Sequence, residues 1–211
     1  MINKAIIHIG IEKTATTSLQ NFLRKNEIEL LRHGYFLPRA GGHYNQELFA
    51  ISFSRGSENF LKRHGVFETS EQAKIRDKLE CDLENEISQL QNTPEAMIIT
   101  SEFFHSKLKT SDEVSALMSL LRKFAIKIEV ICYLKEQTSL ANSRYSTSLR
   151  FASKSSSAEF INCSFVDISI VNDIIKDRSS GSDIQFHVLC VYMCKAQTDM
   201  EFTGWWHTPE L

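Results

Sequence analysis

The sequence predicts an α/β protein with a central, mainly parallel sheet that helices cover on both faces. Short apolar runs alternate with longer amphipathic runs over residues 1–150, which is the pattern of parallel strands joined by crossover helices. Hydrophobic residues make up 42% of the 211 residues, so the chain can bury a proper core. We expect one domain over 1–211, with a well-patterned part over 1–150 and a divergent C-terminal portion over 151–211.

A strand, a turn and a helix form the first predicted unit. Residues 4–10 (KAIIHIG) are a short apolar run that ends at a glycine, as expected of a buried strand. A run with helical periodicity follows and ends at His33-Gly34. Its apolar stripe comprises Leu19, Phe22, Leu23, Ile28 and Leu31. Further strands are predicted at 95–100, 126–134 and 184–193.

Two more helices are predicted by capping boxes, in which a hydroxyl residue and an acidic or amide residue three positions later cap each other's backbone. The boxes are Thr69 with Gln72 and Thr110 with Glu113. Each precedes an apolar stripe at helical spacing. The stripes comprise Ile75, Leu79, Leu83, Ile87 and Leu90 in the first helix and Val114, Leu117 and Leu121 in the second.

Composition narrows the function. The formal net charge of -2 gives no strong positive field, which argues against binding to a nucleic-acid backbone. The apolar run at the N-terminus is too short for a secretory signal or a membrane span. An odd number of cysteines without a CxxC pair favours a reducing compartment, and we expect a cytoplasmic protein. The cysteines are Cys81, Cys132, Cys163, Cys190 and Cys194.

The turn after the first strand, within HIGIEKTATTSLQNFL (residues 8–23), carries a lysine and several hydroxyl groups. Unpaired amides at a helix N-terminus attract anions, and Lys13 adds a positive charge. The hydroxyl donors are Thr14, Thr16, Thr17 and Ser18. The turn can therefore hold a phosphate or sulfate group. In the alternative interpretation these hydroxyls merely cap the helix, with Thr14 as the N-cap.

The spacing differs from the nucleoside-triphosphate P-loop, GxxxxGK[ST]. Gly10 is the only glycine in the turn and stands three residues before Lys13, so the Walker pattern fails. This disfavours a kinase or ATPase.

The same stretch resembles the 5′-phosphosulfate-binding loop of sulfotransferases that use 3′-phosphoadenosine 5′-phosphosulfate (PAPS), in particular the bacterial sulfotransferase-like proteins. The resemblance implies a P-loop-like, three-layer α/β/α fold. It also implies that PAPS is bound by Lys13, Thr14, Ala15, Thr16, Thr17 and Ser18. These enzymes hold the 3′-phosphate with an arginine at the end of a later strand and a serine eight residues on. Here Lys135 and Ser143 stand at those positions, although lysine lacks the planar fork of arginine.

Two further segments are similar to the family. MIITSEFFHSKL (97–108) looks like the segment that ends a central strand in bacterial members, which makes Glu102 or His105 the candidate base for the acceptor. The alternative makes Glu102 a helix-capping charge and His105 a packed surface histidine. RAGGHYNQELF (39–49) corresponds to a loop that lines the acceptor pocket, so His43 and Asn45 are candidate substrate-binding residues.

The resemblance implies a sulfotransferase that transfers a sulfuryl group from PAPS to a hydroxyl or amine of a carbohydrate, lipid or other small molecule. Sulfuryl transfer needs no metal clamp, and no metal-ligand cluster is visible in the sequence, so we expect no metal cofactor. Two alternatives stay open. One is an inactive protein of the same fold that binds a nucleotide or a partner, and the other is a P-loop-like small-molecule kinase.

Overall fold

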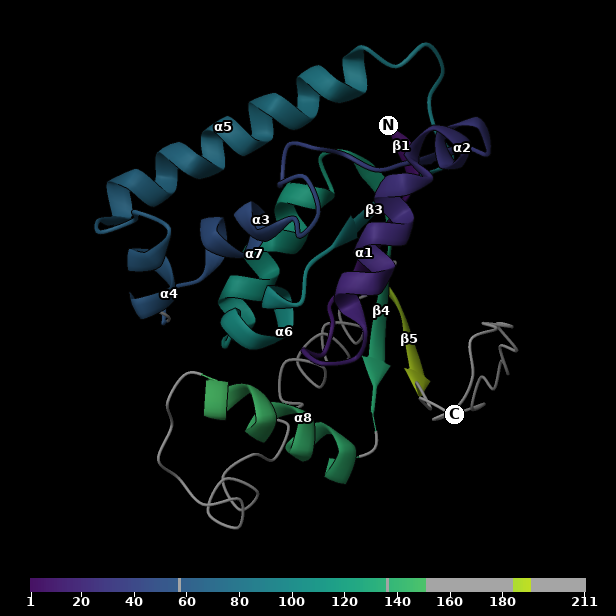
Figure 1. The fold of residues 1–211 in the computed structure, drawn as a ribbon. Coiled ribbons are helices and arrows are strands. Elements are labelled where there is room, and N and C mark those ends of the chain that lie inside the picture. The colour runs from purple at the N-terminus through teal and green to yellow at the C-terminus, as the bar shows by residue number, and fades with distance from the viewer. Residues whose placement is uncertain (57, 136, 151–183, 191–211) are drawn as a thin grey trace.

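The computed structural model describes residues 1–56, 58–135, 137–150 and 184–190. Within these residues a five-stranded sheet has the order β2-β3-β1-β4-β5. Figure 1 shows β1, β3, β4 and β5 of this sheet. Each strand runs parallel to its neighbours, which confirms the predicted parallel sheet. The strands are β1 (Ile2–His8), β2 (Tyr35–Phe36), β3 (Ala96–Thr100), β4 (Ala125–Leu134) and β5 (Ile184–Cys190).

The predicted strand positions are close to the observed ones. β1 begins two residues before the predicted start at residue 4 and ends at His8, while β3 and β4 each differ from prediction by one residue at their start. β5 begins at Ile184 as predicted, and residues 191–193 of that prediction lie outside the described residues. Of the divergent portion over 151–211, only β5 is described.

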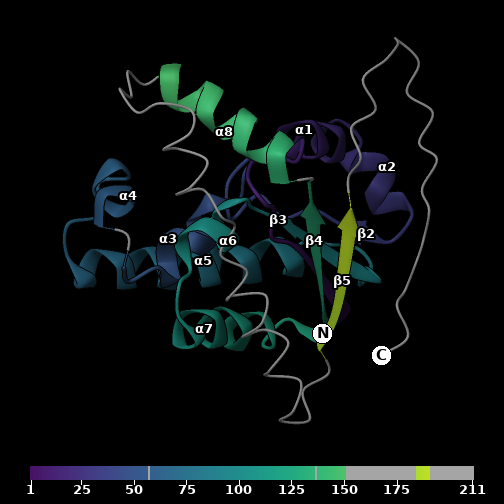
Figure 2. The ribbon, with the colours of Figure 1, turned by 90° about the horizontal axis from the view of Figure 1, so that it is seen from below.

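Helices flank the sheet, with α1 and α2 on one side and α5 and α7 on the other (Figure 2). None of the helices in the described part of the chain has the length and apolar character to cross a bilayer. The helices are α1 (Thr16–Lys25), α2 (Glu27–Arg32), α3 (Glu47–Phe53), α4 (Glu58–Arg63), α5 (Thr69–Ser88), α6 (Phe103–Lys107), α7 (Ser111–Leu121) and α8 (Gln137–Arg150).

The main core lies between the sheet and the layer that contains α3, α5 and α7. Alternate residues of β1, β3 and β4 point into it because side chains of a strand alternate between the two faces. The strand residues include Ala5, Ile7, Met97, Ile99, Ile128 and Val130, and the helix residues include Phe49, Leu79, Leu83, Val114, Leu117 and Leu121. Burial of each large apolar side chain contributes about 1.5–3 kcal/mol, so this layer fixes the sheet and its loops.

The first predicted helix is wrong in two respects. It breaks at Asn26 into α1 and α2, and three members of its predicted apolar stripe are exposed: Phe22 (60%), Ile28 (69%) and Leu31 (43%). The buried face of α1 includes Leu23, as predicted, but otherwise consists of Thr16, Gln20 and Arg24. Polar contacts hold this face of α1 against the rest of the protein, because the guanidinium of Arg24 donates to the carbonyls of Leu37 and Pro38.

The two predicted capping boxes have different outcomes. The box before α7 is confirmed, because Glu113 N donates to Thr110 Oγ1 at 3.3 Å and Thr110 N donates to the Glu113 carboxylate at 2.8 Å. α5 begins at Thr69, but its cap is Glu68 with Glu71, one position before the predicted pair. Glutamate at the third helical position can reach back to cap amides, and Glu71 does so here.

The Glu113 carboxylate also ties two loops together. Its side chain is buried and accepts hydrogen bonds from the backbone amides of Arg55, Lys109 and Thr110. Burial acts to raise the pKa of Glu113, but these amide bonds outweigh it and hold the pKa below its ordinary value. The ends of α3 and α6 are thereby fixed to the start of α7.

We expect Glu113→Gln to destabilise the fold by about 1–3 kcal/mol at neutral pH, because one buried amide loses its acceptor. Since the folded pKa is lowered, the contribution of Glu113 is present above pH 4.5, its ordinary pKa, and is lost as the pH falls through the lowered value. Denaturant unfolding at pH 7 and at pH 3 measures both effects. Glu84→Gln, at an exposed position of α5, is the control. Equal losses in the two variants would contradict the assignment.

Candidate functional site

The carboxyl ends of β1 and β4 define the candidate site. These strands are neighbours, and the chain leaves β1 towards β2 on one side but leaves β4 towards β5 on the other. In open α/β sheets, ligands bind outside the carboxyl ends of the strands where the connections diverge in this way. The loops that follow β1, β3 and β4 are therefore the place to look for binding groups.

The loop after β1 leaves the sheet at Glu12. Pairing with β4 continues past His8, because Tyr133 N donates to Gly10 O at 2.9 Å and Ile11 N donates to Tyr133 O at 3.3 Å. Lys13 and Ala15 then take left-handed φ values of 71° and 61°, on either side of Thr14. Such alternation turns successive backbone amides towards a common centre that suits an anion. For non-glycine residues this conformation costs about 1–2 kcal/mol each, so the surrounding structure holds the loop in a strained shape.

The N-terminus of α1 leaves its amide groups available. Among the described residues, none accepts a hydrogen bond from the amides of residues 13–18. Ala15 occupies the N-cap position and offers no side-chain bond. The alternative in which Thr14 is the N-cap is wrong, because Ala15 occupies that position and no side-chain cap bond is present. The Thr14 hydroxyl instead donates to Ile11 O at 2.6 Å. Free amides and the helix dipole together favour an anion at this point.

The predicted binding residues of the loop separate into two groups. Thr14 and Thr16 are buried, and their hydroxyls donate to Ile11 O and to the Glu102 carboxylate. The other predicted members, Lys13, Ala15, Thr17 and Ser18, are exposed. The exposed amides and side chains can reach a ligand directly, whereas the two buried threonines fix the shape of the loop.

Glu102 joins the β1 loop to the end of β3. It occupies the N-cap position of α6, as the capping alternative expects, but its side chain makes no cap hydrogen bond there. Its Oε2 accepts from Thr16 Oγ1 at 2.6 Å. A Cβ atom at Gly10, which has φ +91°, would lie 3.0 Å from Glu102 Cα. The carboxylate is therefore held beside the N-terminus of α1 by a close backbone contact and a hydrogen bond.

His105 lies on α6 and is buried, with 3% of its surface exposed. The alternative, in which His105 packs on the surface, is therefore wrong, because the side chain is buried. Glu102 is only partly buried and so is the more accessible of the two predicted bases.

The loop after β4 brings together the second predicted pair. Lys135 Nζ donates to Ser143 Oγ on α8 at 3.0 Å. Ser143 Oγ in turn donates to Ser139 O at 2.8 Å. A lysine and a serine hydroxyl thus converge at the carboxyl end of β4, beside the β1 loop.

The loop 39–46, predicted to carry acceptor-binding residues, is attached to the end of β3. Gln46 N donates to Thr100 O at 3.1 Å and Thr100 N donates to Gln46 Oε1 at 2.6 Å. His43 is exposed, and its ring contacts that of Tyr44 edge-on. Asn45 Oδ1 is buried and has no hydrogen-bond partner among the described residues. This attachment fixes the loop that carries His43 and Asn45 to the last residue of β3, two positions before Glu102 in the sequence.

Sequence reasoning missed His8, the last residue of β1. Its Nδ1 lies 2.9 Å from Thr100 Oγ1, and its ring centroid is 4.7 Å from that of Tyr133. Burial lowers the pKa of His8 to about 4, so the imidazole is neutral at physiological pH. An alternating apolar strand pattern gives no signal for such a residue, because burial of its side chain depends on β3 and β4.

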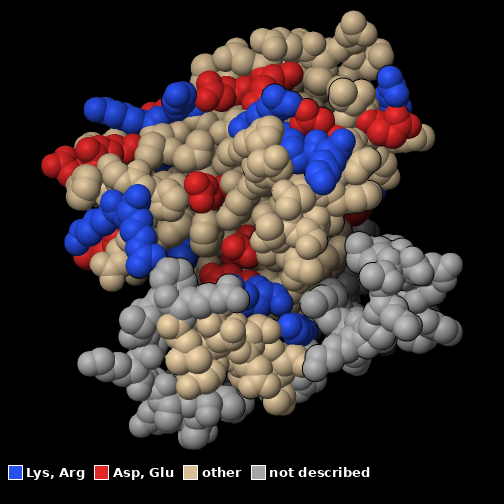
Figure 3. All heavy atoms as spheres, viewed as in Figure 1, with Lys and Arg blue, Asp and Glu red and all other residues tan. Residues whose placement is uncertain are grey.

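Acidic and basic side chains lie close together where α8 meets the rest of the described chain (Figure 3). Within the described ranges, no three His, Cys, Asp or Glu side chains gather as metal ligands.

A scan against models of protein families and a search of curated proteins both found no match for this chain. Membership of the sulfotransferase family therefore stays a prediction from the sequence motifs.

We expect Gly10→Ala to destabilise the protein because it combines a left-handed φ with a contact of 3.0 Å to Glu102. Gly65→Ala is the matched control, since Gly65 has φ +73° but no atom within 4 Å of the added Cβ. The control should lose about 1 kcal/mol from its backbone conformation alone, and Gly10→Ala about 1–3 kcal/mol more from overpacking. Denaturant unfolding measures both. Equal losses would mean that the loop and Glu102 are not held in close contact.

Proposed function

We propose that this chain is a PAPS-dependent sulfotransferase, which transfers a sulfuryl group to a hydroxyl or amine of a small acceptor. The observation that carries the proposal is the convergence of two separate anion-binding groups on neighbouring strand ends. One is the loop with Lys13 and the free amides after β1, and the other is the Lys135–Ser143 pair after β4. A nucleotide with phosphates at both its 3′ and 5′ positions requires two such sites.

The β1 loop suits the phosphosulfate end of PAPS. Amides without protein acceptors are preorganised donors for phosphate and sulfate oxygens. The ammonium group of Lys13 can stabilise the negative charge that develops on the leaving phosphate oxygen. The hydroxyls of Thr17 and Ser18 are exposed at the first turn of α1 and add further donors.

The Lys135–Ser143 pair suits the 3′-phosphate. Lys135 supplies the charge and N–H donors, and the Ser143 hydroxyl can donate to the same anion once it turns away from Ser139 O. Lysine binds phosphate as a point charge and lacks the bidentate fork of arginine. We therefore expect weaker selection for the 3′-phosphate than an arginine at this position would give.

Glu102 is the candidate base. One carboxylate oxygen accepts from Thr16, which leaves the other for the acceptor proton. In the proposed reaction the acceptor oxygen or nitrogen attacks sulfur in line with the phosphate leaving group. A bond from the acceptor to sulfur forms, the sulfur–phosphate oxygen bond breaks, the proton passes to Glu102, and adenosine 3′,5′-bisphosphate leaves.

Calorimetric titration with adenosine 3′,5′-bisphosphate, adenosine 5′-monophosphate and ATP, without added magnesium, tests the nucleotide site. We expect the bisphosphate to bind best, and Lys135→Arg to tighten its binding by about 1 kcal/mol or more, because a bidentate contact replaces a point charge. An unchanged affinity in this variant would remove Lys135 from the site. Tighter binding of ATP once magnesium is added would favour a kinase instead.

Lys13→Ala should lower turnover by at least about 100-fold, as expected for loss of a group that stabilises transition-state charge. The fold should be unaffected, because Lys13 is exposed. Lys25→Ala is the matched control, since it removes an exposed lysine at the other end of α1. Sulfate transfer to a panel of sugar, lipid and phenol acceptors measures turnover. Full activity of Lys13→Ala would exclude this residue from the mechanism, and bisphosphate binding without any turnover in the unsubstituted protein would indicate an inactive scaffold.

A further inference from the structure

We propose that Gln46 is a positioning residue for the acceptor: it holds the loop 39–46 against the end of β3 and so places His43 and Asn45 relative to Glu102. The inference rests on the proposed function for its link to catalysis. The structural part of the proposal, that Gln46 holds the loop against β3, rests on hydrogen bonds that can be measured without an activity assay.

Gln46 is completely buried and its polar groups are satisfied by backbone. The backbone amide of Gln46 donates to Thr100 O at 3.1 Å, and Thr100 N donates to Gln46 Oε1 at 2.6 Å. Thr100 is the last residue of β3. Gln46 Nε2 donates to Pro38 O at 2.7 Å. The backbone and side chain of Gln46 thus add one rung of hydrogen bonds beside the end of β3, and the bond to Pro38 ties the start of the loop to the same residue.

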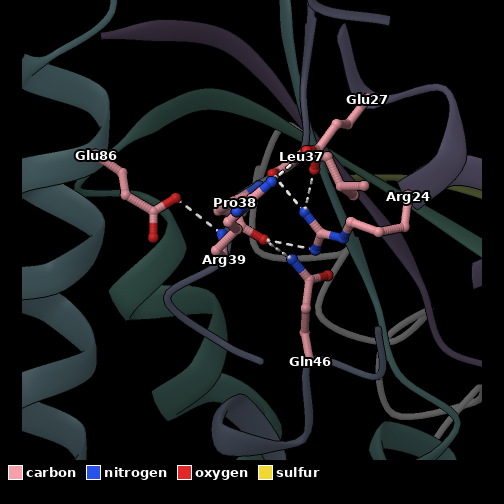
Figure 4. Close-up of polar contacts among 7 residues, drawn as sticks. All are labelled: Arg24, Glu27, Leu37, Pro38, Arg39, Gln46 and Glu86. Atoms are coloured by element: carbon pink, nitrogen blue, oxygen red, sulfur yellow. Dashed lines mark hydrogen bonds and ion pairs between the residues drawn. The ribbon is translucent and has the colours of Figure 1, made fainter. Parts of the chain in front are cut away.

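The same carbonyl of Pro38 connects the loop to α1. Arg24 Nη2 donates to Pro38 O at 3.2 Å and Arg24 Nη1 to Leu37 O at 3.3 Å (Figure 4). Only 4% of the Arg24 side chain is exposed, and its charge is met by Glu27 at 2.9 Å. α1 begins directly after the Lys13 loop. The hydrogen bonds of Arg24 therefore fix the start of loop 39–46 relative to the helix whose N-terminus carries the free amides.

Two further contacts hold the loop on its outer side. Glu27 also pairs with the guanidinium of Arg39, and Arg39 N donates to Glu86 Oε2 on α5 at 2.8 Å (Figure 4). Burial acts to raise the pKa of Glu27, but the hydrogen bonds from Arg24 and Arg39 outweigh it and keep the pKa below its ordinary value. The carboxylate therefore stays ionised at neutral pH.

The loop has little freedom between these anchors. A Cβ at Gly41 would lie 2.3 Å from the Phe49 ring, and one at Gly42, which has φ +125°, would lie 2.6 Å from Asn45 O. The turn is therefore pressed against α3 and against itself. Since Thr100 is followed by Ser101 and Glu102, a shift of Gln46 relative to Thr100 changes the distance between the acceptor loop and the candidate base.

The test compares Gln46→Met, Gln46→Glu and the control Gln72→Met. Methionine keeps the length of the side chain but supplies neither a donor nor a strong acceptor, whereas glutamate keeps the acceptor for Thr100 N. Gln72 is a matched control because its Nε2 donates to two carbonyls, Ile51 O and Ser54 O, each at 2.6 Å, between α3 and α5. Substitution at Gln72 should lower stability without moving the loop 39–46.

We expect Gln46→Met to raise the acceptor KM roughly tenfold or more, since small displacements at a reacting centre have large kinetic effects. Affinity for adenosine 3′,5′-bisphosphate should change less than about twofold, because that site lies on other loops. Gln46→Glu should recover part of the loss, and Gln72→Met should leave the acceptor KM unchanged. Equal effects of Gln46→Met and Gln72→Met on the acceptor KM, or loss of bisphosphate binding in parallel, would make Gln46 merely structural.

Two measurements need no activity. Hydrogen exchange should show faster exchange of the Thr100 amide in Gln46→Met but not in Gln46→Glu or Gln72→Met, and the NMR resonances of the His43 ring should shift only when Gln46 is changed to methionine. If the unsubstituted protein fails to bind the bisphosphate, the proposed function fails while these measurements still decide whether Gln46 holds the loop. If Thr100 exchange and the His43 resonances stay unchanged in Gln46→Met, the positioning role is wrong even in an active enzyme.

Discussion

The close approach of Gly10 to Glu102 is the contact on which the candidate site depends. It brings the loop after β1 within van der Waals distance of the turn after β3, which places a carboxylate beside the N-terminus of a helix. The hydrogen bond from Thr16 to Glu102 then fixes the side chain. Neither contact is strong by itself. Together they convert two neighbouring strand ends into one surface that carries cationic, amide and carboxylate groups.

Buried polar side chains hold the loops at this edge through hydrogen bonds to backbone, in addition to the apolar packing of residues such as Ala40. Gln46 pairs with Thr100, Arg24 donates to Leu37 and Pro38, and Glu113 accepts from the amides of three loop residues. Each is a buried polar side chain whose loss would leave backbone groups unpaired, which costs more than the net value of the bond. The apolar core under the sheet supplies the stability, and these polar residues determine the loop geometry.

Helix α1 illustrates the limit of pattern reasoning. Its apolar residues recur at helical spacing, yet Phe22 is exposed while Gln20 and Arg24 are buried. Apolar periodicity predicts the buried face of a helix when burial of apolar surface contributes most to its packing. Here the strained loop before α1 and the carbonyls that accept from Arg24 fix how the helix is turned. The α7 stripe agrees with the prediction, because Val114, Leu117 and Leu121 are all buried in the core.

The sequence by itself determined the parallel sheet, most strand positions, the α7 capping box and the strand-to-helix turn that carries Lys13. These follow from local signals, namely apolar runs, caps and turn residues, which act over a few positions. The family resemblance singled out Lys135 and Ser143 together, and the two side chains are hydrogen-bonded in the structure. Only the tertiary structure decided that Thr14 and Thr16 are buried, that Glu102 bonds to Thr16, and that Gln46 and His8 both contact Thr100 at the end of β3. Those relations join residues many positions apart, and their geometry depends on how β3 and β4 pair with β1, which no local pattern encodes.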